Sequence, residues 1–213
     1  MFLEVKKLTK YQNGRLLFKE ISFGAEKGEA VSIVSKNPLA LLTLMQILSG
    51  KQSYDGGSVR IGGNEVRSFK RSVFLPRNCK LLPNRTVSEN LLIPLQLKGF
   101  KRNDALKIVS EHLKIFDIER FSNYYPCQLS NSILKIVAIA EMGLFDADII
   151  LLDEPFYGID NESRNKLYRY INSKRLEGIT IILATENDDE AEYLTEKTVF
   201  IDEFCGITTI QNT

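Results

Sequence analysis

The chain has 213 residues, enough to bury one sizeable hydrophobic core with a small second lobe. Its content of 44% hydrophobic and 26% charged residues is ordinary for a soluble globular protein. Because 28 Lys and Arg residues against 27 Asp and Glu residues leave a net charge of +1, bulk electrostatics give no sign of an acidic membrane partner, and we expect no nucleic acid to bind.

The cysteines and the histidine exclude several classes of metal and redox site. Cys79, Cys127 and Cys205 are far apart and lack a CxxC spacing, which is typical of a reducing compartment. His112 is the only histidine, and we expect it to be a surface or partly packed side chain. The first residues show no signal-peptide pattern, and every apolar run is too short to span a bilayer. Any membrane association is therefore expected to go through a partner.

The first fifty residues predict an antiparallel β-layer followed by a strand, a loop and a helix. Strands and turns of the β-layer are expected in the order 2–8, 11–14, 16–23 and 26–29. The β-branched run 30–34 predicts a buried strand, 35–38 a loop, and 39–49 a helix that ends at Gly50. A phosphate-binding loop lies in this kind of setting.

The middle of the chain changes from strand to helix. Short strands are expected at 59–61 and 72–75. From 87 onward the apolar spacing becomes helical, with an amphipathic helix at 103–116 and a helix to Met142 that Ser130 caps. We therefore predict one domain, residues 1–213, in which a helical lobe of about 87–142 is inserted into a core made of 1–86 and 143–213.

After the helical lobe, strands and helices alternate, which predicts an α/β core with a mostly parallel sheet. The expected elements are strand 148–153, helix 161–176, strand 179–184, helix 188–194, strand 198–201 and one more strand at 205–210. Residues 149–152 are branched and apolar without alternation, as in a strand buried on both faces. Asp153 and Glu154 end that strand, and Pro155 stops its ladder. Two acids at a carboxyl end suit Mg²⁺ binding and water activation, or are merely solvated.

Several separate stretches resemble the ATP-binding cassette of ABC transporters, in the order in which that family has them. Tyr11 stands where the family has an aromatic residue that stacks on adenine. Residues 82–95 resemble the segment after the Q-loop, particularly in the lipoprotein-release and cell-division branch. Residues 125–130 resemble the approach to the signature motif, 149–155 a complete Walker B motif, and 158–160 the D-loop. Ordered matches over about 150 residues are far more specific than any single motif.

The resemblance implies a fold, ligands and partners. The implied fold is α/β, a P-loop NTPase-like core with an N-terminal antiparallel β-layer and an inserted helical lobe. ATP and Mg²⁺ are the implied ligands, with Asp153 as the Mg²⁺ holder, Glu154 as the general base and Asp160 as the D-loop acid. The implied partners are a transmembrane permease subunit and a second cassette, in a homodimer or a heterodimer. Such a chain would lie on the cytoplasmic face of the cell membrane.

The phosphate-binding loop departs from the family's G-x-x-x-x-G-K-[ST] form. Aligned by the flanking strand and Gly50, residues 35–43 read Ser-Lys-Asn-Pro-Leu-Ala-Leu-Leu-Thr. Leu41 takes the place of the lysine that reaches the phosphates, and Leu42 that of the hydroxyl that binds Mg²⁺. Ser35 and Ala40 replace the two glycines.

The other residues of this loop do not restore a phosphate site. Pro38 removes one N–H donor, and Asn37 and Thr43 are the family-like residues that remain. The leucines at 39, 41, 42 and 44 are expected around the space that a triphosphate would fill. We expect weak or absent ATP binding, because a polyphosphate against leucines is poorly held and Lys36 does not rebuild the loop.

The other nucleotide-contacting motifs depart in the same direction. The signature motif reads Leu-Ser-Asn-Ser-Ile over 129–133, in which Ser130 keeps its hydroxyl while both glycines and the glutamine are lost. Arg77 occupies the position of the Q-loop glutamine, and Glu186 that of the switch histidine. An ionised Glu186 would repel a γ-phosphate.

Three functions remain open. The first is a non-hydrolysing, structural or regulatory cassette of an ABC-type membrane complex, docking through the helical lobe and residues 77–87. The second is a working ATPase that uses the remaining family-like residues Tyr11, Asn37, Thr43, Asp153 and Glu154. The third is a soluble scaffold, or a binder of another ligand in a leucine-lined pocket. Structural tasks would also explain the acids, with Asp153 capping the loop and Asp160 capping the helix from Asn161.

Overall fold

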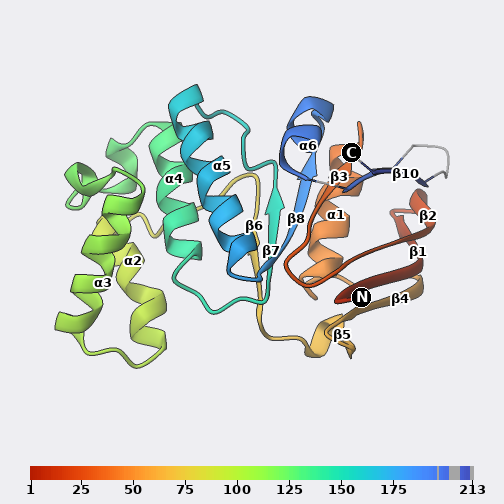
Figure 1. Cartoon of the computed structure of the whole chain (residues 1–213), viewed down its shortest axis with the longest axis horizontal. Coiled ribbons are helices and arrows are strands. Elements are labelled where there is room, and N and C mark those ends of the chain that lie inside the picture. The colour runs from red at the N-terminus through yellow and green to blue at the C-terminus, as the bar shows by residue number, and fades with distance from the viewer. Residues whose placement is uncertain (196, 202–206, 212–213) are drawn as a thin grey trace. The chain divides into compact units, whose positions relative to one another are not determined.

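The structure is a computed structural model, and it describes residues 1–195, 197–201 and 207–211. Two compact units make up the chain, and Figure 1 shows their elements in chain order. Unit 1 comprises residues 1–77, 147–155 and 171–213, and unit 2 comprises residues 78–146 and 156–170.

An antiparallel sheet forms the first layer of unit 1. Its strands are β1 Leu3–Gln12, β2 Arg15–Ala25, β4 Gly56–Ile61 and β5 Asn64–Glu65, in the order β2-β1-β4-β5. The turn between β1 and β2 is Asn13-Gly14, and both residues have positive φ, 51° and 76°. A two-residue turn of this type matches the twist of the strands it joins. The predicted N-terminal β-layer is confirmed.

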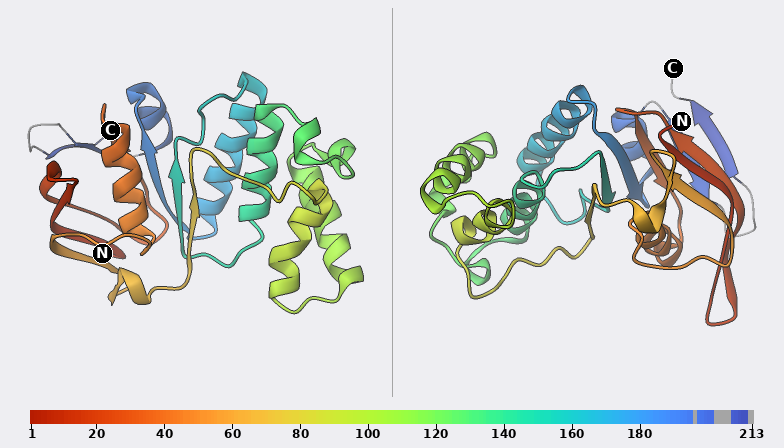
Figure 2. Two further views of the ribbon diagram at one scale, coloured as in Figure 1. Left: turned by 180° about the vertical axis from the view of Figure 1, so that it is seen from behind. Right: turned by 90° about the horizontal axis from the view of Figure 1, so that it is seen from below.

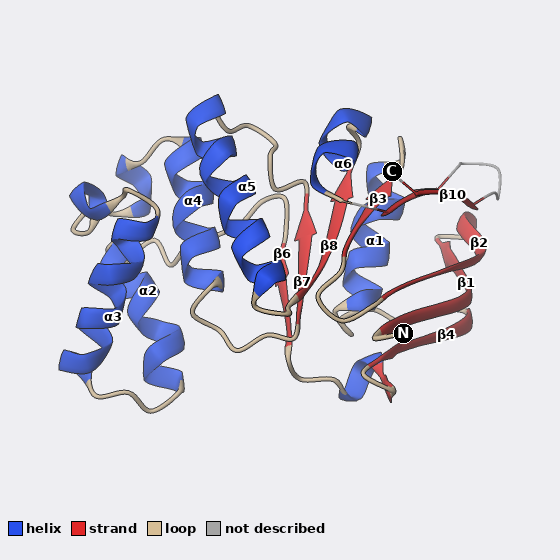
Figure 3. Ribbon diagram, in the orientation of Figure 1, coloured by secondary structure: helices blue, strands red, loops and turns tan. Residues whose placement is uncertain are grey.

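A mostly parallel sheet forms the second layer of unit 1 (Figure 3). Its strands are β3 Ala30–Val34, β6 Ser72–Leu75, β7 Ile149–Asp153, β8 Thr180–Thr185, β9 Lys197–Ile201 and β10 Ile207–Gln211, in the order β10-β9-β3-β8-β7-β6. Only the β10–β9 pairing is antiparallel among the described strands of this sheet. All five residues of β7 are buried, as the unbroken apolar run predicts.

The core of unit 1 lies between its two sheets. Helix α1, Pro38–Leu48, contacts β2 of the first sheet and β7 and β8 of the second, and Figures 1 and 2 show it between them. Helix α6, Asp188–Leu194, packs on β3, β8 and β9. Because β3, β6, β7 and β8 are parallel, the loops that follow them meet at one edge of the sheet. This edge positions the candidate site of unit 1.

Unit 2 is helical. Its helices are α2 Val87–Leu97, α3 Arg102–Ile115, α4 Asn131–Met142 and the first part of α5 Asn161–Leu176. Thr86 and Glu89 form a capping box at the start of α2, and Ser130 caps α4 as predicted. The predicted helix at 103–116 is confirmed as α3, with a buried stripe of Ala105, Val109 and Leu113. His112 is half-buried, as expected.

Short 3₁₀ turns complete the described elements, namely η1 Val66–Ser68, η2 Glu119–Phe121 and η3 Pro126–Gln128. The strand expected at 205–210 is present from Ile207, whereas Cys205 lies outside the described residues. In the described parts of the chain, no helix combines the length and the apolar character needed to cross a bilayer.

Candidate functional site

The backbone amides of the loop between β3 and α1 are hydrogen-bonded to acceptors within the loop itself. The Asn37 Oδ1 atom caps α1 by accepting hydrogen bonds from the N–H groups of Leu39, at 3.1 Å, and Ala40, at 3.2 Å. The Asn37 N–H donates to Ser35 Oγ at 3.2 Å, and the Leu41 N–H donates to the Asn37 carbonyl at 3.2 Å. The start of a helix ordinarily offers such N–H groups to an anion. In this loop they are already bonded within the protein.

The leucines of α1 lie in different environments. Leu41 and Leu44 are fully buried in the core of unit 1, Leu42 is half-buried, and Leu39 is exposed. The prediction that all four surround one open space is wrong for Leu41 and Leu44. Helical geometry turns these two side chains toward the sheets, so Leu41 is a core residue at the position of the family's lysine.

Lys36 extends to the loop after β8. Its Nζ atom donates to the Glu186 carbonyl at 2.8 Å and pairs with Asp188 at 3.0 Å. Glu186 lies in the loop after β8 and Asp188 is the first residue of α6, so neither partner belongs to the loop before α1. Lys36 thus ties two loops together at the carboxyl edge of the sheet.

Arg77 and Glu186 form an ion pair at the same edge. The Arg77 guanidinium lies 2.9 Å from Glu186 Oε1, and the two side chains are 30% and 38% exposed. The Arg77 N–H also donates to Asp153 Oδ2 at 3.3 Å. The loops after β6, β7 and β8 are therefore joined by groups of the protein itself.

Glu154 connects the ends of β7 and β8. Its N–H donates to the Ala184 carbonyl at 2.9 Å, and its Oε1 atom accepts from the Glu186 N–H at 2.5 Å. The residue is buried and has a φ of 48°, a left-handed conformation that costs a residue other than glycine about 1–2 kcal/mol. Burial raises the pKa of Glu154 and the charge of Glu186 adds to the rise, while the bond from the Glu186 N–H opposes it.

The residues around Asp153 do not fit a Mg²⁺ ion. Asp153 is buried, and Leu42, which the resemblance aligns with the family's Mg²⁺-binding hydroxyl, offers no oxygen. The next hydroxyl, that of Thr43, is buried and donates to Gln12 Oε1 at 3.2 Å. Across the described residues, no group of three or more His, Cys, Asp or Glu side chains is arranged to hold a metal ion. One carboxylate without a hydroxyl partner is a poor site for an ion that demands near-octahedral oxygen ligands.

Tyr11 is the penultimate residue of β1, and it is exposed to solvent. The residue is 47% exposed, and its N–H donates to Asp55 Oδ2 at 2.7 Å. Lys10 pairs with the same carboxylate at 3.2 Å. Asp55 therefore holds the end of β1, a role that sequence reasoning missed because the two segments are 44 residues apart.

The signature-like segment and Asp160 belong to unit 2. Ser130 Oγ accepts from the Ile133 N–H at 3.4 Å, and Ser132 Oγ accepts from the Asp160 N–H at 3.2 Å. The Asp160 carboxylate accepts from the Ser163 N–H at 2.8 Å, which lowers the pKa of Asp160. Asp160 thus caps α5, as its structural interpretation predicts.

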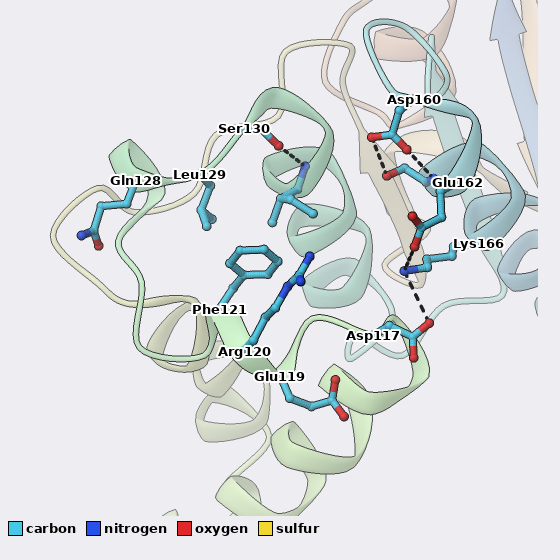
Figure 4. Close-up of a pocket in the computed structure, with 12 residues that line it drawn as sticks. Asp117, Glu119, Arg120, Phe121, Gln128, Leu129, Ser130, Asp160, Glu162 and Lys166 are labelled. Carbon is cyan, nitrogen blue, oxygen red and sulfur yellow. Dashed lines mark hydrogen bonds and ion pairs between the residues drawn. The ribbon is translucent and has the colours of Figure 1, made fainter.

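A cavity of about 720 Å³ lies beside this segment within unit 2 (Figure 4). Lys166 pairs with Asp117 at 3.4 Å and with Glu162 at 2.9 Å on one side of it. On the other side the Arg120 guanidinium lies 4.7 Å from the centre of the Phe121 ring. The wall is of mixed charge, and sequence patterns place Gln128, Leu129, Ser130, Ile133 and Asp160 of its residues in signature-like and D-loop stretches.

Comparisons with known proteins agree on the family. The model of the ABC transporter family matches residues 18–157. The chain belongs to the ABC transporter ATP-binding cassette family.

Relatives cover most of the chain. An uncharacterised ABC transporter ATP-binding protein of Methanocaldococcus jannaschii, MJ0412, is 31% identical over 93% of this chain and 77% of its own length. The Bacillus subtilis ABC transporter ATP-binding protein YtrE is 30% identical over 82% of this chain and 80% of its own. The Bacillus cereus aliphatic sulfonates import ATP-binding protein SsuB is 31% identical over 93% and 79%.

Solved cassettes share the fold. A dimeric structure of the ATP-binding cassette MJ0796 in a post-hydrolysis state, bound to ADP and Pi, superposes with a TM-score of 0.88 over 99% of both chains. The sequence identity is 23%, so this likeness concerns the fold. The predicted α/β architecture, with a parallel and an antiparallel sheet, is confirmed.

Proposed function

We propose that this cassette does not hydrolyse ATP and serves as a structural or regulatory subunit of an ABC-type membrane complex. The closed loop before α1 is the observation that carries the proposal. Its amides at 37, 39, 40 and 41 are bonded to Ser35 and Asn37, and Pro38 has no N–H to offer. A phosphate group entering this loop would have to break the cap of α1.

The charges at the carboxyl edge support the same proposal. Lys36, the one cation of the loop, is paired with Asp188. Arg77 and Glu186 stand at the Q-loop and switch positions and pair with each other. Phosphoryl transfer depends on preorganised positive charge around the γ-phosphate. At this edge the positive charges of Lys36 and Arg77 are instead paired with carboxylates of the protein.

The partners follow from the family and from the names of the relatives. SsuB is named as an import ATP-binding protein, and MJ0796 is described as a dimer. We propose that this cassette docks on a transmembrane permease subunit through unit 2 and residues 77–87, on the cytoplasmic face of the membrane. In this family each ATP site lies between the phosphate-binding loop of one cassette and the signature segment of the other. A homodimer of this chain would have both sites altered on both sides, whereas a heterodimer with an intact cassette would have each site altered on one side. Residues 82–95 support the lipoprotein-release and cell-division branch.

Phosphate release by the purified chain and by its membrane complex tests the proposal. We expect release to equal that of a Glu154→Gln variant, because Glu154 is not aimed at a held triphosphate. YtrE, a relative named as ATP-binding, serves as the positive control. Release that Glu154→Gln abolishes would contradict the proposal. Purification of the tagged chain from membranes together with a permease separates this function from that of a soluble scaffold.

A working ATPase is the second candidate, and the conformation of Glu154 favours it. A buried acid held at a φ of 48° is the kind of strained residue that clusters at functional sites. The variant Ala40→Gly, Leu41→Lys, Leu42→Ser asks whether the acids still work once the loop is restored. Recovered hydrolysis would place the loss in the loop alone. Because Leu41→Lys puts a charge at a core position, absent hydrolysis would implicate the signature and switch positions only in a variant that urea denaturation shows to be folded.

A further inference from the structure

The turn between α2 and α3 exposes apolar side chains at the end of a helical hairpin (Figure 1). We name residues 97–102, Leu-Lys-Gly-Phe-Lys-Arg, the α2–α3 tip. Leu97 is 77% exposed and Phe100 is 43% exposed. Isolated exposed apolar residues are ordinary on a protein surface, but two within four residues on a protruding turn form a small patch.

The backbone of the α2–α3 tip is fixed by its own hydrogen bonds. The N–H groups of Lys98, Gly99 and Phe100 donate to carbonyls of the last turn of α2, at 3.2, 2.9 and 3.1 Å. Gly99 supplies the left-handed residue of this helix end, with a φ of 85°. The apolar side chains are therefore presented by an ordered turn.

Cations flank the two apolar residues in the sequence, and Arg102 also interacts electrostatically with Glu89 of α2. Residues 97–107 hold four Lys or Arg residues and one acid, Asp104. Lys98 pairs with Asp146 at 2.7 Å. Lys101 and Arg102 are exposed, and neither forms an ion pair with a described residue. The net charge of +1 for the whole chain hides this local excess.

We propose that the α2–α3 tip binds the surface of a membrane that contains anionic lipid, with Leu97 and Phe100 entering the interface and Lys101 and Arg102 against the head groups. A flat lipid surface suits a convex turn, whereas a peptide partner would need a groove. Apolar insertion combined with juxtamembrane cations is the chemistry by which proteins lie on membranes without spanning them. The contact is independent of nucleotide and goes beyond the proposed function.

Flotation of the full chain with vesicles tests the proposal. We expect it to bind phosphatidylcholine vesicles that contain phosphatidylglycerol, more weakly at high salt, and not to bind phosphatidylcholine alone. Each cation near an anionic surface is worth roughly fivefold in affinity, so Lys101→Glu with Arg102→Glu should lower binding by at least about 25-fold. Leu97→Ser with Phe100→Ser should lower it by roughly tenfold or more. All four side chains are exposed, so folding should be unaffected.

Matched variants separate the tip from general electrostatics. Arg67→Glu with Lys70→Glu makes the same charge change on exposed residues of unit 1, and Leu176→Ser removes a leucine that is 91% exposed near two cations. Both should leave vesicle binding unchanged. Equal loss in these controls, or no binding to anionic vesicles, would overturn the proposal. A third outcome would also overturn it: the tip variants bind vesicles as the parent chain does but no longer join the membrane complex. The tip would then contact a protein and not lipid.

Discussion

At the scale of single residues, the proposed loss of nucleotide binding rests most directly on the ion pair of Arg77 with Glu186. The resemblance described above places both residues at positions where the family contacts ATP, and our proposal of a non-hydrolysing cassette rests in part on these two departures. Their charges are opposite, and their side chains meet at 2.9 Å. Either residue without the other would leave an uncompensated charge at this partly buried edge, whereas the ion pair neutralises both charges.

The coupling between these two residues is measurable. A cycle of Arg77→Met, Glu186→Gln and the double variant should give a coupling of about 0.5–1 kcal/mol in the free energy of unfolding, since the pair is only partly buried. Urea denaturation provides the measurement. The same cycle on the more exposed pair Lys36–Asp188 should give less. A coupling of zero at Arg77–Glu186 would mean that the two charges do not hold the loops together.

The free energy of unfolding should depend on pH through Glu141. Burial raises the pKa of Glu141 to about 7. The unfolded chain loses this proton near pH 4.5 and the folded chain near pH 7, so folding loses stability as the pH rises through that interval. Glu141→Gln should therefore be more stable than the parent chain above pH 7, by on the order of 1–2 kcal/mol after solvent screening, with the gap shrinking toward pH 4.5. Unfolding curves at pH 5 and pH 8 test this, and a gap that does not change with pH would contradict it.

At the scale of elements, the cap of α1 is the contact on which the proposal of a non-hydrolysing cassette depends. Asn37→Ala should cost about 1 kcal/mol in the free energy of unfolding, because it removes the side-chain acceptor of the Leu39 and Ala40 amides and leaves Ala40 only the Asn37 carbonyl. Asn37→Ser should keep most of the stability. Urea denaturation measures both variants. An Asn37→Ala chain as stable as the parent would show that these amides do not depend on the cap.

Sequence patterns were enough to predict the elements that form the site, but not the contacts between them. The unbroken apolar run before Asp153 predicts a buried parallel strand, and Ser130 and Asp160 predict helix caps, because these signals are local. The pair of Arg77 with Glu186 joins residues 109 apart, so only the folded sheet brings them together. Leu41 was predicted to lie beside the phosphate space and not in the core. That prediction is wrong because α1 is apolar on several faces, so its periodicity does not say which face meets the sheets.

At the scale of the whole molecule, the proposed function predicts that ATP does not change the assembly of this cassette. In this family ATP lies between the loop of one cassette and the signature segment of the other. In this chain Asn37 caps the first, and the resemblance aligns Asn131 and Ser132 with the glycines of the second. Light scattering should therefore give the same mass with and without ATP and Mg²⁺. A mass that doubles only when ATP is added would contradict this.

Titration of the purified chain with ATP and Mg²⁺ in an isothermal calorimeter tests the central claim most directly. A loop whose amides are already bonded, beside an edge whose charges are already paired, predicts no binding heat up to millimolar ATP. The relative YtrE, titrated under the same conditions, shows that the assay detects an ATP-binding cassette. Saturable binding of ATP by this chain in the micromolar range would contradict the account.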